Sequence, residues 1–420
     1  MAPGGVVQPA PGARYGLAIL FAVALFNYID RSIVAILQEP IKRDLGLSDT
    51  QLGLLTGLSF ALVYATMALP IARIADRVNR KKLIAIALAI WSGATALSGL
   101  ARNFPTLVAL RMGVAFGEAG SVPASHSMIS DYFPLGRRGT ALALWGLSNP
   151  LGTMLGFAFG GMLADALSWR EAFLIFGVAG LAFAPIVLTA REPVRGTFDH
   201  GASTDRMAFR DTVAFLWRTK AFRYLLVGGV AHAFIIHLLH SWNAPFYVRV
   251  FDLPIREVAL FLALSTGLAG GMGQFLGGWL GDRLAGDTTA WYMRLPAIAS
   301  ALLLPVTLVQ YLAPGRTLSM VMGASSLFLI AIFYAPVVAA AQTVVPPRMR
   351  AFTSAVLVLC TNLLGLSLAP VLAGAISDYL DPIYGDQSLR YALAILMPMS
   401  ALAVFGFVKA AQHMRAMERA

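Results

Sequence analysis

Twelve long apolar segments run through this chain. They cover residues 15–37, 50–72, 83–101, 105–130, 138–164, 169–190, 222–250, 256–281, 291–312, 317–340, 351–378 and 388–411. A hydrocarbon layer about 30 Å thick needs about 20 apolar residues per helix. Because lipid offers the backbone no hydrogen-bond partner, only helices or closed barrels cross it, and these segments have helical lengths. The sequence predicts an all-α membrane protein with twelve transmembrane helices.

The composition agrees with a membrane protein. Only 13% of the residues are charged, against about 25% in soluble proteins. The net charge of +11 would suggest a nucleic-acid partner in a soluble protein, but here we interpret the excess as membrane-orienting lysine and arginine. Cys360 is the single cysteine, which rules out an internal disulfide. No phosphate-binding loop, nucleophile motif or metal-ligand cluster stands out, so we expect no cofactor, no metal and no enzyme activity.

Lysine and arginine also predict the orientation. The termini and the connections after even-numbered helices carry 21 of these residues, against eight in the other connections. Such a bias places both termini in the cytoplasm. Residues 1–14 and 412–420 are then cytoplasmic tails, the first of them disordered. The short loops are typical of a bacterial protein of the inner (plasma) membrane.

A polar stretch, residues 191–221, divides the spans into an N-terminal bundle (15–190) and a C-terminal bundle (222–411). Within it an amphipathic helix is predicted on the cytoplasmic interface. Its apolar side would hold Phe209, Val213, Leu216 and Trp217, and its polar side Arg210, Asp211 and Arg218.

The two bundles repeat each other with a constant offset of 213 residues. The pairs are Arg137/Arg350, Thr140/Thr353, Asn149/Asn362, Gly152/Gly365, Gly161/Gly374 and Asp165/Asp378. Six-helix repeats related by a pseudo-twofold axis are typical of secondary transporters, whose substrate site lies between the halves near the midplane. A lipid-gated channel and an intramembrane hydrolase fit this repeat less well.

Charged residues interrupt two of the apolar segments. Asp30 and Arg31 are adjacent in the first, and Arg111 and Glu118 lie two turns apart on one face of the fourth. A charge at mid-bilayer depth costs about 2.5–3.5 kcal/mol on insertion scales, so such residues face a protein interior or a watery cavity. We interpret the four as a titratable network; the alternative is a static ion-pair cluster.

The four charged residues are candidates for two roles, proton carrier and anchor of the substrate. Asp30 is the preferred proton carrier, because Arg31 beside it provides a charge partner, and Glu118 is the second choice. Arg31 and Arg111 are candidate anchors for an anionic head group. Tyr64 and Asn149, on spans expected to line the cavity, complete the predicted substrate site. His232, His237 and His240 in the seventh span are either a proton relay or satisfied interior histidines, and both interpretations stay open.

A motif recurs at the predicted cytoplasmic ends of the second and eighth spans. The run from Ala72 to Lys81 contains Asp76-Arg77, and the second copy ends in Asp282-Arg283. Both resemble the cytoplasmic motif of the major facilitator superfamily, although Ala72 and Asn79 replace expected glycines. The resemblance implies two six-helix bundles and a conformational latch formed by Asp76, Arg77, Asp282 and Arg283. The alternative is a positively charged loop with an incidental acid.

Further motifs resemble spinster-type transporters. They are Asn27-Tyr28-Ile29-Asp30-Arg31, Gly117-Glu118-Ala119 and Ser130-Asp131-Tyr132-Phe133. The resemblance implies a monomer in the bilayer that moves an amphipathic anion, a lysophospholipid or sphingoid phosphate, coupled to protons. The anion:cation symporter branch has similar motifs, so a proton-coupled transporter of small polar organic anions is the alternative.

Overall fold

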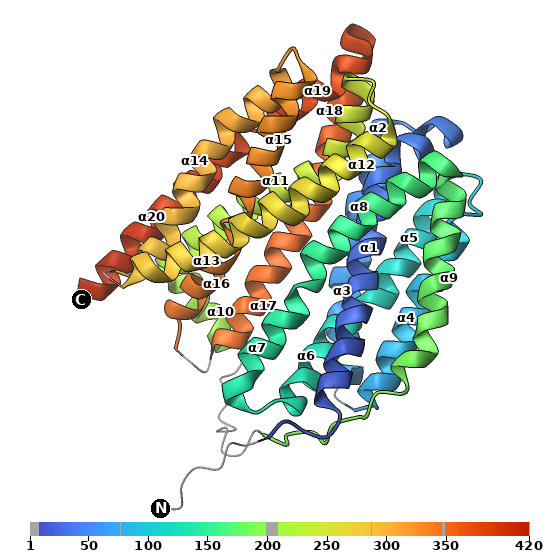
Figure 1. Cartoon of the computed structure of the whole chain (residues 1–420). Helices are drawn as coiled ribbons and strands as arrows, with labels where there is room; N and C mark the ends of the chain where they lie inside the picture. Colours follow the sequence, from blue (N-terminus) through green and yellow to red (C-terminus); the bar gives the residue numbers. More distant parts are fainter. Residues whose placement is uncertain (1–7, 76, 199–208, 287, 347–348, 420) are drawn as a thin grey trace, which may run out of the picture. The chain divides into compact units, whose positions relative to one another are not determined.

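The computed structural model of the chain describes residues 8–75, 77–198, 209–286, 288–346 and 349–419, and within these ranges it contains helices and no strands (Figure 1). Asp76 of the predicted latch and half of the predicted tail 1–14 lie outside the described residues. The prediction of an all-α protein is confirmed.

The N-terminal half contains nine α-helices and one π-helical turn among its described residues. They are α1 (Ala13–Leu45), α2 (Asp49–Gly53), η1 (Leu54–Leu58), α3 (Ser59–Ala75), α4 (Arg80–Ser98), α5 (Phe104–Glu118), α6 (Ser121–Tyr132), α7 (Leu135–Gly146), α8 (Ser148–Ala166) and α9 (Trp169–Val187). Ala119 and Gly120 separate α5 from α6, and Leu147 separates α7 from α8.

The remaining helices follow the polar stretch. They are α10 (Phe209–Arg218), α11 (Lys220–Val250), α12 (Ile255–Leu264), η2 (Ser265–Gly270), α13 (Gly271–Ala285), α14 (Trp291–Leu312), α15 (Arg316–Ala331), α16 (Tyr334–Thr343), α17 (Arg350–Cys360), η4 (Thr361–Leu366), α18 (Ser367–Tyr384), η5 (Gly385–Gln387), α19 (Ser388–Leu396) and α20 (Met399–Arg419).

Nine helical stretches of the described chain are long and apolar enough to cross a membrane. One of them, Phe352–Arg419, contains two predicted spans, 351–378 and 388–411. Two further predicted spans are each divided into consecutive shorter helices, α5 with α6 and α7 with α8. The helices are therefore consistent with twelve spans. The break between α7 and α8 also matches the start of η4 at the 213-residue offset, because Ser148 corresponds to Thr361.

The chain forms two compact units. Unit 1 consists of Met1–Leu37 and Leu62–Thr204, and unit 2 of Gln38–Ala61 and Asp205–Ala420. Unit 2 thus includes the end of α1, all of α2 and the start of α3, in addition to the C-terminal half. In unit 1, α4 packs on α5 and α9; in unit 2, α11 packs on α20, and α14 on α15 and α20 (Figure 1).

Small residues bring helices of unit 1 close together. A Cβ atom on Gly156 of α8 would lie 2.7 Å from the carbonyl oxygen of Ile29 in α1. A Cβ atom on Gly177 of α9 would lie 2.3 Å from the backbone nitrogen of Ala96 in α4. No larger residue fits at these contacts, so α1 and α4, which carry charged and polar residues, are held by backbone-to-backbone packing.

In unit 2, the N-terminus of α2 binds a carboxylate of α18. The Asp378 carboxylate accepts hydrogen bonds from the backbone N–H groups of Asp49 and Thr50, each at 2.8 Å, and from the Thr50 hydroxyl at 2.6 Å. The first N–H groups of a helix lack intrahelical partners and carry a partial positive charge, which a carboxylate satisfies. Arg249 of α11 binds Asp49 at 2.6 Å and Glu39 at 3.0 Å.

The predicted amphipathic helix is present as α10. Leu216 is buried in the core of unit 2, next to Phe222 and Leu225 of α11. Val213 and Trp217 are exposed. Only part of the predicted apolar side therefore packs on protein, and the predicted position of this helix on the cytoplasmic interface stays a prediction.

The contact of α2 with α18 gives a test of this packing. A Cβ atom on Gly374 would lie 2.2 Å from the carbonyl oxygen of Asp49, so Gly374→Ala forces α2 away from Asp378. We expect a loss of about 1–3 kcal/mol in stability, measured as a lower apparent Tm in detergent. Gly271→Ala is the control, because its Cβ meets no atom within 4 Å. Equal melting temperatures of both variants would contradict the packing.

Candidate functional site

Two helices of unit 1, α1 and α5, bring the intramembrane charges together. The helix α1 runs without a break through Asp30 and Arg31. The helix α5 begins after Asn103, whose side chain caps the N–H of Thr106 at 3.0 Å, and it ends at Glu118. With Arg111 two turns before Glu118, α5 presents both groups to α1.

The charges pair crosswise between α1 and α5. Arg111 Nη1 lies 2.9 Å from Asp30 Oδ2, and Arg31 Nε lies 2.9 Å from Glu118 Oε2. The adjacent residues Asp30 and Arg31 thus bind different partners, because neighbouring side chains leave a helix about 100° apart. The charge partner expected for Asp30 was Arg31; the structure gives it Arg111.

Both carboxylate oxygens of Asp30 have hydrogen-bond partners. Besides Arg111, the hydroxyl of Thr95 on α4 donates to its other carboxylate oxygen. A cavity of about 10 Å³ adjoins Asp30 and is lined in part by Ser92 and Thr95, which is room for one water molecule. Thr95 was not predicted from the sequence, where a hydroxyl residue in an apolar span carries no specific signal.

Only one carboxylate oxygen of Glu118, Oε2, has a hydrogen-bond partner among the described residues. Its side chain is 0% exposed, and Arg31 binds Oε2. Oε1 has no hydrogen-bond partner within the described part of the chain. Buried polar atoms are almost always hydrogen-bonded, so an exception calls for a functional explanation.

Arg31 is the accessible member of the cluster. Its side chain is 29% exposed, against 4% for Arg111. The guanidinium carbon lies 5.1 Å from the centre of the Tyr64 ring, a cation–π distance. Asn149 is exposed at the start of α8, one turn before Gly152, which packs against Tyr28 of α1.

Two described residues of the predicted latch, Asp282 and Arg283, have local partners. Arg77 is exposed, Asp282 accepts a hydrogen bond from Tyr292 at 3.0 Å, and Arg283 lies over the Trp279 ring at 5.3 Å. The same motif in unit 1 contributes a buried cation that the sequence did not single out. Arg80 pairs with Asp131 and, at 2.8 Å, with Glu192.

Of the three histidines in α11, His232 is a satisfied core residue. Its Nδ1 lies 2.9 Å from the Ser300 hydroxyl and its Nε2 lies 3.0 Å from the Ile330 carbonyl oxygen. Its ring stacks on Phe333 with centroids 4.3 Å apart. His237 and His240 are half-buried. Among the described residues, no group of three His, Cys, Asp or Glu is placed to hold a metal ion.

Comparison with known proteins identifies relatives over nearly the whole chain. The sequence profile of the Major Facilitator Superfamily matches residues 20–370. An MFS-type efflux pump of Mycolicibacterium smegmatis is 33% identical over 91% of this chain and 88% of the pump. A probable L-galactonate transporter of Escherichia coli is 26% identical over 67% of this chain and 65% of that protein.

A solved structure extends the similarity to the fold. The crystal structure of a bacterial homolog of the human lysosomal transporter Spinster, in an inward-facing and unoccupied conformation, superimposes with a TM-score of 0.84. It is 29% identical in sequence and covers 97% of both chains.

The crosswise pairing predicts how substitutions combine. Arg111→Met leaves the Asp30 carboxylate buried beside Thr95 without its cation, which we expect to cost about 3–5 kcal/mol. The double variant Arg111→Met/Asp30→Asn removes both charges and should regain most of that loss. Apparent Tm values of Arg111→Met, Asp30→Asn, the double variant and the wild type measure the coupling. Additive destabilisation by the two substitutions would contradict the pairing.

Proposed function

Since this chain belongs to the Major Facilitator Superfamily, we propose that it moves an amphipathic anionic lipid, of lysophospholipid or sphingoid-phosphate type, by proton-coupled alternating access. The relatives and the protein of the matched crystal structure are transporters. The chain is therefore a spinster-like secondary transporter in a membrane and not an enzyme. We further propose that it works as a monomer in a bacterial plasma membrane with both termini in the cytoplasm.

The accessible guanidinium of Arg31 is the observation that carries the proposal of an anionic cargo. Arginine matches phosphate and carboxylate oxygens through its planar fork of N–H donors. Arg31 combines partial exposure with an aromatic neighbour, Tyr64, and it lies within the apolar segment 15–37. A cation beside apolar surface suits a molecule with an anionic head and a hydrocarbon chain. Arg111, which is buried and bound to Asp30, would hold the cluster in place.

The same ion pair supports coupling to protons. An anion that binds Arg31 competes with Glu118 for the guanidinium. A buried carboxylate without its cation is costly, whereas a protonated carboxyl group is neutral and releases Arg31. Protonation of Glu118 and binding of an anion at Arg31 then favour each other. Asp30, held by Thr95 and Arg111, is the second acid of the proposed coupling pair, and its release would require movement of α4 or α5.

Alternating access also needs contacts that open and close. We propose that Asp76, Arg77, Asp282 and Arg283 form a latch at the cytoplasmic ends of the helices. The buried Arg80 supports the unit 1 copy, because it fixes the start of α4 to Asp131 of α6 and to Glu192. Asn149 and Tyr64 remain proposed substrate contacts beside the cluster.

A second candidate cargo is a small polar organic anion. The similarity to a probable L-galactonate transporter favours it, and Arg31 can bind a carboxylate as well as a phosphate. Flux into liposomes, measured for lysolipids and for sugar acids with and without a proton gradient, separates the two. Transport of water-soluble carboxylates alone would replace the lipid proposal.

The coupling proposal predicts the behaviour of Glu118→Gln. Glutamine resembles the protonated carboxyl group, so the variant should bind the anion with an affinity that no longer changes with pH and should lose proton-driven accumulation. Exchange of anion across the membrane should persist. Asp30→Asn is expected to lose proton-driven transport as well. The control is Glu257→Gln, an exposed acid of α12 that lies 4.0 Å from Arg316. Full proton-driven accumulation by Glu118→Gln would exclude Glu118 as a carrier.

The anchor proposal predicts the behaviour of Arg31→Gln. Loss of a charge-assisted pair of hydrogen bonds should weaken binding of an anionic lysophospholipid by about tenfold or more. Binding of an uncharged monoacylglycerol should change little. Titration by tryptophan fluorescence measures both, with Arg102→Gln as a control at an exposed arginine outside the proposed site and latch. Equal weakening for charged and uncharged ligands would assign Arg31 a structural role.

A further inference from the structure

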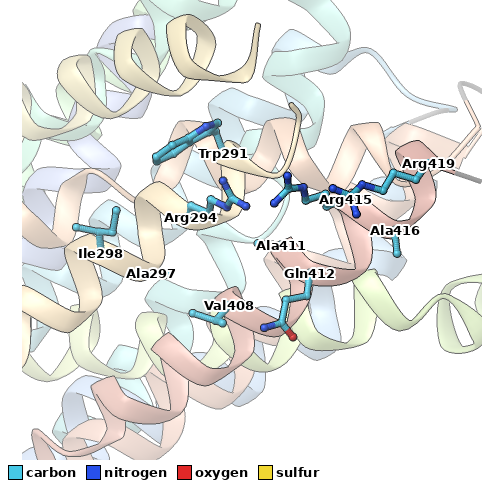
Figure 2. Close-up of a pocket in the computed structure, with 10 residues that line it drawn as sticks. All are labelled: Trp291, Arg294, Ala297, Ile298, Val408, Ala411, Gln412, Arg415, Ala416 and Arg419. Atoms are coloured by element: carbon cyan, nitrogen blue, oxygen red, sulfur yellow. The ribbon is translucent and has the colours of Figure 1, made fainter. Parts of the chain in front are cut away.

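Unit 2 contains a cavity that the proposed transport site does not use. It has a volume of about 790 Å³ and lies between the start of α14 and the end of α20 (Figure 2). Its lining residues are Trp291, Arg294, Ala297, Ile298, Val408, Ala411, Gln412, Arg415, Ala416 and Arg419. The charge cluster of Asp30 and Glu118, by contrast, belongs to unit 1.

Three arginines face this cavity. Arg294 comes from α14, and Arg415 and Arg419 come from α20; Figure 2 shows the guanidinium groups of Arg294 and Arg415 turned toward one another. Within the described ranges, none of the three forms an ion pair with a carboxylate. Like charges that converge without an acidic partner repel, and an anion between them removes the repulsion.

The acid nearest in sequence is already engaged. Glu418 accepts hydrogen bonds from the Thr288 hydroxyl at 2.5 Å and from the Thr289 backbone N–H at 2.6 Å. These bonds attach the end of α20 to the residues just before α14, and so they fix the two walls of the cavity. The Glu418 carboxylate interacts electrostatically with Arg415, but its hydrogen-bond donors are Thr288 and Thr289 and not the cavity arginines.

The deeper walls are apolar. Ala297 and Ala411 are buried, whereas Ile298 is 50% and Val408 is 40% exposed. These exposed aliphatic residues lie on two predicted membrane spans, where hydrocarbon chains are the natural neighbours. Trp291 lies at the charged end, with the Arg294 guanidinium 5.3 Å from its ring centre, and tryptophan is enriched at the membrane–water interface.

We propose that this cavity binds an anionic phospholipid of the cytoplasmic leaflet. The arginines hold its phosphate, and its acyl chains lie along Ile298 and Val408. The predicted orientation places the start of α14 and the end of α20 at the cytoplasmic surface, where basic pockets between helices bind anionic head groups. The apolar walls favour a lipid over a soluble phosphate, because only a lipid has hydrocarbon chains that can pack against them. The bound lipid bridges α14 and α20 and stabilises their contact.

The experiment titrates cardiolipin into the full-length protein in detergent and follows the apparent Tm. The wild type should become more stable, because a ligand that binds only the folded state raises its melting temperature. In Arg294→Gln/Arg415→Gln the cardiolipin concentration at half-maximal shift should rise at least about tenfold. The control Lys409→Gln/Arg223→Gln removes two positive charges from α20 and α11 that do not line the cavity, and it should stay within about twofold.

Three results would overturn the proposal. They are an unchanged titration in the arginine variant, an equal loss in the control variant, and a shift reproduced by glycerol 3-phosphate without any lipid. Arg31→Gln should leave the cardiolipin shift intact even if it abolishes transport, which separates this site from the proposed transport site.

A second measurement remains informative if the arginine variant does not fold. Brominated cardiolipin should quench the fluorescence of the wild type more strongly than brominated phosphatidylcholine does. Trp291→Phe should remove the difference. Quenching that stays the same in this variant would place the lipid elsewhere.

Discussion

The neutralisation of buried charge governs the organisation of unit 1. Two acids and two bases lie in an apolar bundle, and each can remain charged there only beside a partner. The structure satisfies this with two separate ion pairs between α1 and α5, Asp30 with Arg111 and Arg31 with Glu118. Because each pair joins the same two helices, any relative movement of α1 and α5 changes both. The two pairs therefore connect the charge state of Asp30 and Glu118 to the relative position of α1 and α5. An ion pair within one helix would not make this connection.

The two ion pairs differ in exposure and in how many hydrogen-bond partners their carboxylates have. The pair of Asp30 and Arg111 is buried on both sides and is reinforced by Thr95, so it holds its geometry. The pair of Arg31 and Glu118 has one exposed member and one oxygen without a donor in the described residues. In the proposed transport cycle, the pair of Asp30 and Arg111 keeps in place the groups that the pair of Arg31 and Glu118 releases and recaptures.

Periodicity and charge in the sequence predicted the spans, the members of the charge cluster and the helix α10. They did not predict which charges pair. Asp30 and Arg31 are neighbours in sequence, but they leave α1 in different directions, and only the packing of α4 and α5 decides what each one meets. The same limit applies to Asp49, Arg249 and Asp378, which are far apart in sequence and meet at the N-terminus of α2. Contacts of this kind depend on three-dimensional packing, on which a single sequence carries no direct information.

The two arginine sites show how one chemical group can serve different purposes. Arg31 and Arg294 both lie against an aromatic ring, and Arg294 shares its cavity with the apolar residues Ile298 and Val408. Arg31 has a buried carboxylate, Glu118, as its ion-pair partner, so under the proposed coupling the occupancy of this site by an anion depends on the protonation of Glu118. Arg294 has no carboxylate within ion-pair distance in the described part of the chain, and two further arginines share its cavity. An anion at that site displaces no internal partner, so its binding costs less and is less dependent on pH. The difference in neighbouring acids, not in the arginines themselves, makes the first site suited to release a cargo and the second suited to retain a lipid.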